Sequence, residues 1–443
     1  MRIAVVGLGK IGLPLAVQFA RKNHDVIGVD INPKTVDLIN RGLEPFPEEN
    51  QLQEYLTEMV QANKLRATVD YQEAISVADT VVIVVPLFVD TARNPDFSAL
   101  DQATNLIGKY MKKGTLICYE TTLPIGTTRT RFTEVLESIS GHKVGEEFFV
   151  VFSPERVFTG RIFQDLKKYP KIVGGVTPEC GSKGVKFYES VLDFDVRSDL
   201  DRPNGVWLVK NSETAEFVKL AETTYRDVNI ALANEFALHA EVKGVDIYEV
   251  IDSANSQIFS HIHQPGISVG GHCIPIYPQF YTWGDPDSVI VKTTRRVNEN
   301  MPRRVVSHIK EELGELSESK VLILGLSYRP NVKESAFSGT FDIASILENE
   351  NANVQVLDPY YSENEIKNFG LEPYDGIMGN IDVIIIHTAH NEFIEFFKQN
   401  LPHSLFVYDG RNLFANESKP NKINLKVLGK SETYKGGKSE HRG

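Results

Sequence analysis

A lone cysteine on a glycine-rich turn is the residue whose type and setting best suit covalent chemistry. Cys273 lies in the run VGGHCIPIYPQFY, residues 269–281, directly after Gly270, Gly271 and His272. A thiolate on an exposed loop is a nucleophile, and adjacent glycines let the backbone come close to a ligand. Free cysteines are more often small buried side chains without reactivity. The turn by itself leaves both interpretations open.

A second group of residues predicts a dinucleotide site near the N-terminus. The run GLGKIG, residues 7–12, follows an apolar segment, residues 3–6, and precedes a helical pattern. Its glycines allow a tight turn, approach of a pyrophosphate and close packing of a helix whose N-terminus faces the phosphates. Asp30 ends the next strand and suits free ribose hydroxyls, which predicts NAD rather than NADP. The expected cofactor contacts are Gly7, Gly9, Lys10, Ile11, Gly12, Asp30, Pro86 and Thr122.

Polar residues that follow two later strands are further candidates. Thr122 lies in ETTLPIGTT, residues 120–128, and Glu155 lies in SPERVFTGR, residues 153–161. Ligands bind at the carboxyl ends of parallel strands, so Thr122 could hold a ligand or a water and Glu155 could act as a base. A threonine-rich helix cap and a simple charged pair with Arg156 are the alternatives. Lys219 lies within a long helical run, where its stem can equally cover apolar surface.

Composition limits the class of protein. The chain has 443 residues, 42% hydrophobic and 24% charged, which is typical of a soluble globular protein with more than one domain. Its net charge of -12 argues against binding of a nucleic-acid backbone. Three widely spaced cysteines predict neither disulfides nor a metal site, and neither a signal peptide nor a membrane-spanning run is recognised. We expect a cytoplasmic protein with no metal, no nucleic-acid partner and no membrane partner.

Strands and helices must alternate to position these residues. Apolar runs separated by helical patterns predict a doubly wound parallel sheet, with strands at residues 3–6, 25–30, 80–85, 115–120 and 148–153. A run without Gly or Pro begins near residue 213 and continues to Gly244, which predicts one long helix that forms a connector and a homodimer or higher homo-oligomer interface. A second α/β pattern begins at Lys320. The fold class expected is α/β, with two Rossmann-like doubly wound domains joined by a long central helix.

Four divisions of the chain follow from this pattern. They are an NAD-binding domain, a helical connector and dimerisation domain, a C-terminal α/β domain and a disordered tail, at residues 1–200, 201–315, 316–418 and 419–443.

Eight motifs, in order, resemble those of nucleotide-sugar 6-dehydrogenases, the family that includes the UDP-glucose and GDP-mannose dehydrogenases. They are GLGKIGLPLA, VIVVPLFVD, ETTLPIGTT, SPERVFTGR, KLAETTYRDVNIALANE, VGGHCIP, GLSYRP and YDGRN, and they span residues 1 to about 414. SPERV, TYRDVNIALANE and GGHCIP are most similar to the branch that acts on UDP-N-acetylmannosamine and UDP-N-acetylglucosamine. The resemblance implies a UDP-sugar substrate and a place in polysaccharide biosynthesis.

The resemblance also implies roles for the candidate residues. Two NAD+ molecules in turn would oxidise the 6-hydroxymethyl group of the sugar to a carboxylate, through a thiohemiacetal and a thioester on Cys273. Lys219 would stabilise the oxyanion, Glu155 would transfer protons, and Thr122 would orient a water. The C-terminal domain would hold the uridine diphosphate. The implied substrate contacts are Glu155, Arg156, Lys219, Asn229, Gly270, His272, Arg329 and Arg411.

Three places depart from the usual family pattern. Thr223 replaces an asparagine and Tyr277 replaces an aspartate. After Pro330, residues 331–335 form a shortened version of the segment that family members usually have there. The set of cysteine, lysine, glutamate and threonine is complete, which predicts an active enzyme. UDP-glucose or GDP-mannose is the alternative substrate within the family. A two-electron hydroxyacid or sugar-phosphate dehydrogenase and a non-catalytic nucleotide-sugar-binding protein are the alternative functions.

Overall fold

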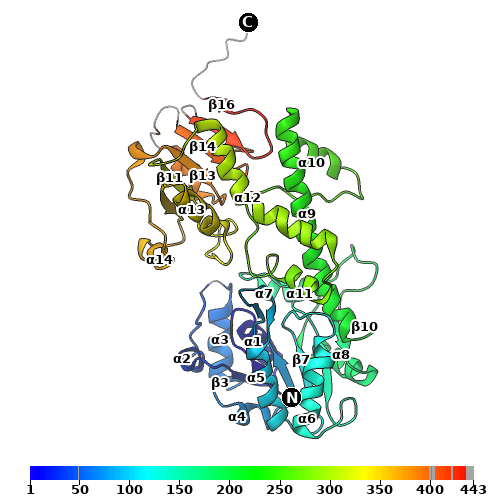
Figure 1. Cartoon of the computed structure of the whole chain (residues 1–443). Helices are drawn as coiled ribbons and strands as arrows, with labels where there is room; N and C mark the ends of the chain where they lie inside the picture. Colours follow the sequence, from blue (N-terminus) through cyan, green and yellow to red (C-terminus); the bar gives the residue numbers. More distant parts are fainter. Residues whose placement is uncertain (48, 399–400, 402–404, 421–422, 436–443) are drawn as a thin grey trace. The chain divides into compact units, whose positions relative to one another are not determined.

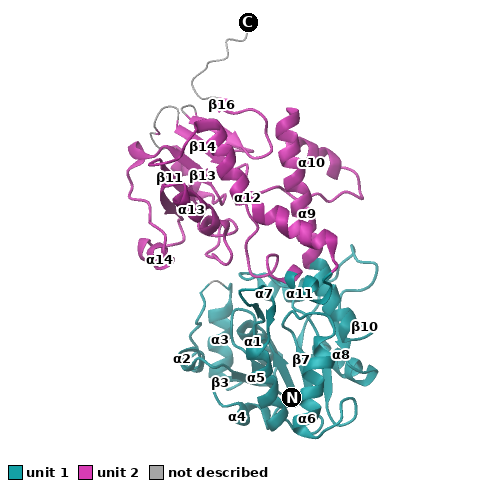
Figure 2. Cartoon of the chain, viewed as in Figure 1, with its two compact units in different colours: residues 1–222, 279–286 teal, residues 223–278, 287–443 magenta. Residues whose placement is uncertain are grey.

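The chain folds into two compact units. The computed structural model describes residues 1–47, 49–398, 401, 405–420 and 423–435 (Figure 1). Unit 1 comprises Met1–Glu222 and Gln279–Pro286, and unit 2 comprises Thr223–Pro278 and Asp287–Gly443 (Figure 2). Residues 201–315, which the sequence predicted as a separate central domain, are therefore divided between the two units.

Unit 1 is built on an eight-stranded sheet with the order β10-β9-β8-β7-β4-β1-β2-β3. Five of these strands, β1, β4, β7, β8 and β9, are buried almost throughout, as is typical of strands covered by helices on both faces. The strands are β1 (Arg2–Val6), β2 (Asp25–Val29), β3 (Leu65–Thr68), β4 (Thr80–Ile83), β7 (Leu116–Tyr119), β8 (Phe149–Phe152), β9 (Lys171–Gly175) and β10 (Val206–Val209). A separate pair is β5 (Phe88–Val89) and β6 (Pro95–Asp96).

Helices connect these strands in the order expected of a doubly wound sheet. They are α1 (Gly12–Arg21), α2 (Pro33–Asn40), α3 (Leu52–Gln61), α4 (Tyr71–Ile75), α5 (Ser98–Tyr110), η1 (Thr128–Thr133), α6 (Glu134–Ser140), α7 (Ile162–Lys168) and α8 (Pro178–Val191). The predicted α/β class is confirmed, with strand boundaries that differ from the predicted ones by one or two residues.

Two strands at one edge of the sheet, β9 and β10, run opposite to the others. The sequence predicted a parallel sheet, but β9 runs antiparallel to β8, with Phe152 paired to Gly174, and β10 runs parallel to β9. Continuing this register past the end of β8 brings Glu155 opposite Lys171, the first residue of β9. The reversal therefore places Lys171 on the side of the sheet where β1, β4, β7 and β8 have their carboxyl ends.

The predicted long helix is confirmed as α9 (Ser212–Lys243), a helix of 32 residues. It begins in unit 1, ends in unit 2, and stops before Gly244, whose φ of 75° is the left-handed conformation that commonly ends helices. The short helix α11 (Tyr277–Gly284) likewise has residues in both units. No helix within the described residues combines the length and the apolar character that a bilayer span requires.

Unit 2 contains a six-stranded sheet with the order β12-β11-β13-β14-β15-β16. Alternate residues of β11, which lies between β12 and β13, enter two different cores: Val321 and Ile323 pack in one, Leu322 and Leu324 in the other. The strands are β11 (Lys320–Leu324), β12 (Asn353–Leu357), β13 (Val383–Ile386), β14 (Leu405–Asp409), β15 (Ile423–Val427) and β16 (Tyr434–Lys435). The remaining helices are α10 (Ile247–Asn255), α12 (Val289–Leu313), α13 (Gly339–Asn349), α14 (Glu363–Asn368), η2 (Met378–Asn380) and α15 (Glu392–Phe396).

The prediction of a disordered tail from residue 419 is wrong for part of that segment. Strand β15 pairs in parallel with β14, and its residues Ile423, Leu425 and Val427 are buried. The surrounding Lys, Asn and Ser residues conceal this short alternating pattern in the sequence. Residues 421–422 and 436–443 of the expected tail lie outside the described residues.

Candidate active site

The glycine turn after β1 has the geometry of a phosphate-binding loop. Gly7 has a φ of 91°, and a side chain on Gly12 would overlap the carbonyl oxygen of Gly7. A Cβ on Gly9, in contrast, would meet nothing within 4 Å. Among the described residues no side chain caps α1, which leaves its N-terminus to interact with an anion. The turn therefore fits the pyrophosphate of a dinucleotide.

Asp30 is fixed beside this turn by two backbone hydrogen bonds. Its Oδ2 accepts the N–H of Leu8 at 2.9 Å, and its Oδ1 accepts the N–H of Asn32 at 2.8 Å. Each carboxylate oxygen keeps a second lone pair, so Asp30 can also accept hydrogen bonds from a ribose. Lys10 and Ile11, within the turn, are half-buried.

The ends of β4 and β7 lie next to the glycine turn. A Cβ on Gly7 would come within 3.1 Å of the backbone of Val84 and Val85, and Pro86 follows them as an exposed residue. The Thr121 hydroxyl donates a hydrogen bond to the Val85 carbonyl at 2.6 Å, which joins the two strand ends. Thr122, the next residue, is buried.

Glu216 holds the loop that carries Thr122, a role that the sequence did not reveal. Its Oε2 accepts the N–H of Gly126 at 2.6 Å, and its Oε1 accepts the N–H and the hydroxyl of Thr128 at 2.8 and 2.6 Å. Burial raises the pKa of Glu216 to about 7, although these hydrogen bonds oppose the shift. No local pattern in the sequence marked Glu216, because its neighbours one turn away on α9 are mostly polar: Ser212, Glu213, Lys219 and Leu220.

Lys219 and Glu155, predicted as catalytic residues, lie together. The Lys219 ammonium donates a hydrogen bond to the backbone carbonyl of Glu155 at 2.7 Å. The expected pair between Glu155 and Arg156 does not form. Arg156 instead contacts Glu222 at 2.9 Å, while the Glu155 carboxylate contacts the ammonium of Lys171. Adjacent residues in extended backbone point to opposite sides, which explains the two separate partners.

Lys171 joins Glu155 to a second buried carboxyl group. Its Nζ lies 2.9 Å from Glu120 Oε2, and Glu120 Oε1 accepts the hydroxyl of Tyr188 at 2.7 Å. Burial alone would raise the pKa of Glu155, but Lys171, Glu120 and Lys219 together outweigh burial and lower it. Burial raises the pKa of Glu120 well above its ordinary value despite the same cation. None of the sequence motifs indicated Lys171.

Cys273, in unit 2, is half-buried at the start of a tight turn. Its carbonyl accepts the N–H groups of Ile276 and Tyr277 at 3.2 and 2.9 Å. The two preceding glycines serve a protein contact: a side chain on Gly270 would collide with Tyr328 and lie 2.9 Å from the carbonyl oxygen of Phe337. Close packing against Tyr328 is therefore sufficient to explain the two glycines. The prediction that they make room for a ligand stays a prediction.

A buried polar network in unit 2 anchors this cysteine loop at both ends. Asp227 Oδ1 accepts hydrogen bonds from Arg295 and from Asn298, each at 2.7 Å. Arg295 also reaches the carbonyl of Ile274 at 3.4 Å. Asn234, which donates to Asn298 at 2.9 Å, accepts the N–H of Gly266 at 2.8 Å. Asp227 was missed because its partners on α12 are about seventy residues away in the sequence.

Three predicted substrate contacts are already engaged by other parts of unit 2. Asn229 bonds the carbonyl of His261 at 2.6 Å and the N–H of His263 at 2.8 Å. Arg411 donates to the carbonyl of His387 at 2.7 Å and to that of Ser268 at 3.2 Å. His272 Nε2 lies 3.3 Å from the carboxylate of Glu334. Their roles as substrate contacts remain predictions.

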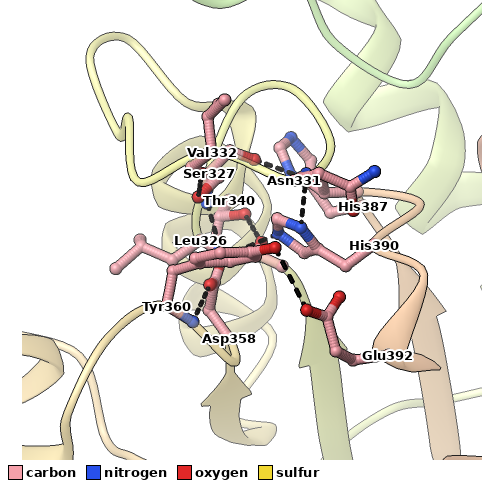
Figure 3. A network of polar contacts seen from close by, with 12 residues as sticks. Leu326, Ser327, Asn331, Val332, Thr340, Asp358, Tyr360, His387, His390 and Glu392 are labelled. Carbon is pink, nitrogen blue, oxygen red and sulfur yellow. Dashed lines mark hydrogen bonds and ion pairs between the residues drawn. The ribbon is translucent and has the colours of Figure 1, made fainter. Parts of the chain in front are cut away.

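A second polar network fixes the segment that carries Arg329 (Figure 3). Asp358, at the end of β12, accepts the N–H groups of Leu326 and Ser327, both at 2.8 Å. His390 Nδ1 accepts the N–H of Asn331 at 2.9 Å, so its Nε2 carries the proton that is donated to Asp358 at 3.1 Å. Both ends of the short segment 326–331 are thereby held.

Comparison with known protein families agrees with this arrangement. The NAD-binding domain of the UDP-glucose/GDP-mannose dehydrogenase family matches residues 1–192, its central domain matches residues 213–300, and its UDP-binding domain matches residues 322–416.

Individual relatives match almost the whole chain. The UDP-N-acetyl-D-mannosamine dehydrogenase of Pyrococcus horikoshii is 35% identical over 424 residues, covering 93% of this chain and 96% of the relative. A solved structure of the UDP-D-ManNAc dehydrogenase from Pyrococcus horikoshii has a TM-score of 0.87 at 33% identity, covering 97% of this chain and 100% of that one. A UDP-glucose dehydrogenase from Pyrobaculum islandicum has a TM-score of 0.83 at 25% identity, with 97% and 98% covered. The chain therefore belongs to the UDP-glucose/GDP-mannose dehydrogenase family and is an NAD-dependent nucleotide-sugar dehydrogenase.

Proposed function

We propose that this enzyme oxidises the 6-hydroxymethyl group of a UDP-N-acetylhexosamine, of the ManNAc or GlcNAc type, to a carboxylate. The observation that carries the choice of sugar is the 35% identity, over 93% of the chain, to a UDP-N-acetyl-D-mannosamine dehydrogenase. The overall reaction consumes the alcohol, two NAD+ and one water, and yields the uronate, two NADH and three protons. UDP-glucose and GDP-mannose are the alternative substrates within the family.

Cys273 is the nucleophile in this proposal. The glycine turn and Asp30 would hold NAD+, which would supply the oxidant by taking up a hydride in each of the two oxidations. The Cys273 sulfur bonds to carbon 6 of the aldehyde that the first oxidation leaves, which retains it as a thiohemiacetal. The second oxidation converts the thiohemiacetal to a thioester, and water then cleaves the C–S bond. Support comes from the half-buried setting of Cys273, which a buried and inert cysteine does not share.

Lys219 and Glu155 act on the oxygen atoms of these species. Lys219 is 7% exposed and its ammonium is held by the Glu155 carbonyl, so it supplies a fixed positive charge where an oxyanion develops. The Glu155 carboxylate takes the proton of the water that attacks the thioester. Thr122 orients that water through its hydroxyl.

Counting NADH for each sugar consumed tests the proposal. The purified enzyme should release two NADH per sugar with UDP-N-acetylmannosamine or UDP-N-acetylglucosamine, and much less with UDP-glucose or GDP-mannose. A site built for the acetamido group leaves its own polar groups unpaired with glucose, which can reduce kcat/KM by several orders of magnitude. One NADH per sugar would indicate a simple two-electron dehydrogenase, and none would indicate a nucleotide-sugar-binding protein.

The cysteine step has its own test. Cys273→Ala should abolish uronate formation and leave the Kd for NAD+ unchanged. Normal turnover by this variant, with two NADH per sugar, would exclude the covalent step while leaving the choice of sugar intact.

We also propose that the enzyme is a homodimer or a larger homo-oligomer in the cytoplasm, where it supplies a uronic acid for polysaccharide biosynthesis. Support for assembly comes from apolar side chains of α9 that are between 38% and 76% exposed, namely Phe217, Tyr225, Leu232, Phe236 and Val242. Exposed apolar patches of this kind mark interfaces in soluble proteins. Light scattering should give at least twice the 49.7 kDa mass of the chain. A mass near 50 kDa at micromolar concentration would contradict this prediction.

A further inference from the structure

Two carboxyl groups and one ammonium are buried together beside the proposed base. Lys171 is 5% exposed and Glu120 is 3% exposed, while the side chain of Glu155 is 10% exposed. Lys171 contacts both carboxyl groups, and its ammonium also lies 4.7 Å from the centre of the Tyr188 ring. These side chains come from four elements of unit 1. Glu120 and Glu155 follow β7 and β8, Lys171 begins β9, and Tyr188 lies on α8.

The two carboxyl groups of this cluster contact the same ammonium, that of Lys171, whereas the nearby Lys219 ammonium is bonded to the backbone carbonyl of Glu155. One ammonium in direct contact can neutralise one carboxylate, and ionising the second buried carboxyl group beside it would be costly, which favours retention of a proton. Glu120 Oε1 accepts a hydrogen bond from Tyr188, Glu120 Oε2 contacts Lys171, and the Glu155 carboxyl group contacts the same ammonium. Two carboxyl groups that meet at one ammonium can share a hydrogen bond when one of them is protonated.

The pKa directions agree with this geometry. Burial raises the pKa of Glu120 well above its ordinary value. Burial has the same tendency at Glu155, but the charges of Lys171 and Lys219 and the hydrogen bond from Glu120 lower its pKa. Burial opposes the charge on Lys171, yet the two carboxyl groups raise its pKa. Cys118, whose pKa burial also raises, contributes no charge at neutral pH.

We propose that Glu120 and Glu155 share a single proton beside Lys171, carried mainly by Glu120, and that Glu120 and Lys171 are positioning residues that keep Glu155 ionised. This inference rests on the proposed function for its catalytic consequence. When water attacks the thioester, its oxygen bonds to the carbonyl carbon, its proton goes to Glu155, and the C–S bond breaks to release the Cys273 thiolate. Lys171 and the protonated Glu120 thus prepare Glu155 to accept that proton at neutral pH.

The cluster is not sealed from solvent. A small pocket beside it is lined by residues that include Glu155, Arg156, Asp165, Tyr169 and Lys171. The proton that Glu155 accepts can leave through this pocket, which restores the shared-proton state for the next turnover.

Infrared spectroscopy tests the shared proton without any substrate. At pH 8, above the pKa of about 7 of Glu216 and of about 6 of Asp409, the wild type should retain the C=O band of one protonated buried carboxyl group. Glu120→Gln and Glu155→Gln should each lose this band, because the one carboxyl group that remains can ionise against Lys171. Lys171→Met should keep it. Persistence of the band in Glu155→Gln, or its absence from the wild type, would overturn the proposal.

The pH profile of kcat tests the catalytic consequence. A cation near an acid lowers its pKa by about one to three units, so Lys171→Met should move the acid limb to higher pH by roughly that amount. Lys171→Arg keeps a cation beside Glu155, so its acid limb should lie at the wild-type pH. Glu120→Gln, whose amide can still donate to Glu155, should also have the wild-type acid limb. Lys112→Met, which breaks the Lys112–Asp79 pair at the amino ends of the strands, is the control and should shift nothing.

The two experiments separate the failure of this inference from failure of the proposed function. If the enzyme forms two NADH per sugar but the acid limb is the same in Lys171→Met as in the wild type, the positioning role is wrong and the proposed function stands. If no sugar is oxidised but the infrared pattern holds, the shared proton stands and the proposed function is wrong. If Lys171→Met does not fold, the two glutamine variants and Lys171→Arg still decide the question.

Discussion

A single methyl group, added at Gly12 or at Gly9, should separate the two tasks of the glycine turn. At Gly12 the new Cβ would overlap the carbonyl oxygen of Gly7 and lie 3.0 Å from its carbonyl carbon, so α1 and the turn must move apart. Overpacking of this kind typically costs about 1–3 kcal/mol. For a unit of this size, such a loss lowers Tm by roughly 2–12 °C. Gly12→Ala should therefore be less stable even without cofactor.

Gly9→Ala is the matched variant with the opposite effect. Its Cβ meets nothing within 4 Å, and Gly9 is not among the residues with positive φ, so the fold should be unaffected. The methyl group would occupy the space through which a pyrophosphate approaches the backbone. A lost hydrogen bond to a charged group is worth about 1.5–3 kcal/mol, or roughly a ten- to hundredfold rise in the Kd for NAD+.

Thermal unfolding without cofactor and calorimetric titration with NAD+ measure the two effects independently. We expect a lower Tm for Gly12→Ala and a wild-type Tm with a weaker Kd for Gly9→Ala. If Gly9→Ala bound NAD+ as tightly as the wild type, the pyrophosphate would not lie over this turn. A wild-type Tm for Gly12→Ala would show that the contact with Gly7 does not constrain the fold.

Other residues of the site give further predictions. Asp30→Ala should reduce the preference for NAD+ over NADP+, measured as a ratio of kcat/KM, because a carboxylate there repels a 2'-phosphate; an unchanged ratio would contradict its role. Glu216 has a pKa of about 7 in the folded protein against 4.5 for the ordinary side chain, so folding favours its protonated form and the stability it contributes is lost as pH rises between these values. Urea unfolding at pH 5 and pH 8 should show the wild type losing on the order of 3 kcal/mol relative to Glu216→Gln, and parallel changes would refute this. Asp227→Ala should destabilise the protein by about 3 kcal/mol because, among the described residues, it leaves buried Arg295 with Glu299, at 3.5 Å, as its one acidic partner; a loss below about 1 kcal/mol would show that the pair matters little.

Features set by neighbouring residues were predictable from the sequence. The glycine turn, Asp30, the buried strands and α9 each depend on a local pattern of about ten to thirty residues, and the structure contains all of them. The likeness of ordered motifs also predicted the family, which the matches over residues 1–192, 213–300 and 322–416 confirm.

Features set by distant partners were not predictable in this way. Lys171 and Glu120 are 51 residues apart, and Lys171 reaches the site only because β9 runs antiparallel to its neighbour. Glu216 is 88 residues from Thr128. The sequence around a buried charged residue does not differ from that around an exposed one. The topology of the sheet, and not local spacing, determines which residue becomes its partner.

In each of the two sheets, an aspartate directly after a strand accepts a backbone N–H from the turn after the neighbouring strand. The surroundings of the two aspartates differ, which explains why unit 1 binds a dinucleotide and unit 2 need not. Asp30 ends β2 and accepts the N–H of Leu8, while Asp358 ends β12 and accepts the N–H of Leu326. Asp30 is half-buried and faces a turn with three glycines, so it can still reach a ribose. Asp358 is 2% exposed and is bonded to His390 as well, so its capacity is used within the protein. In unit 2 the carboxylate at the position that corresponds to Asp30 supports the loop that carries Arg329.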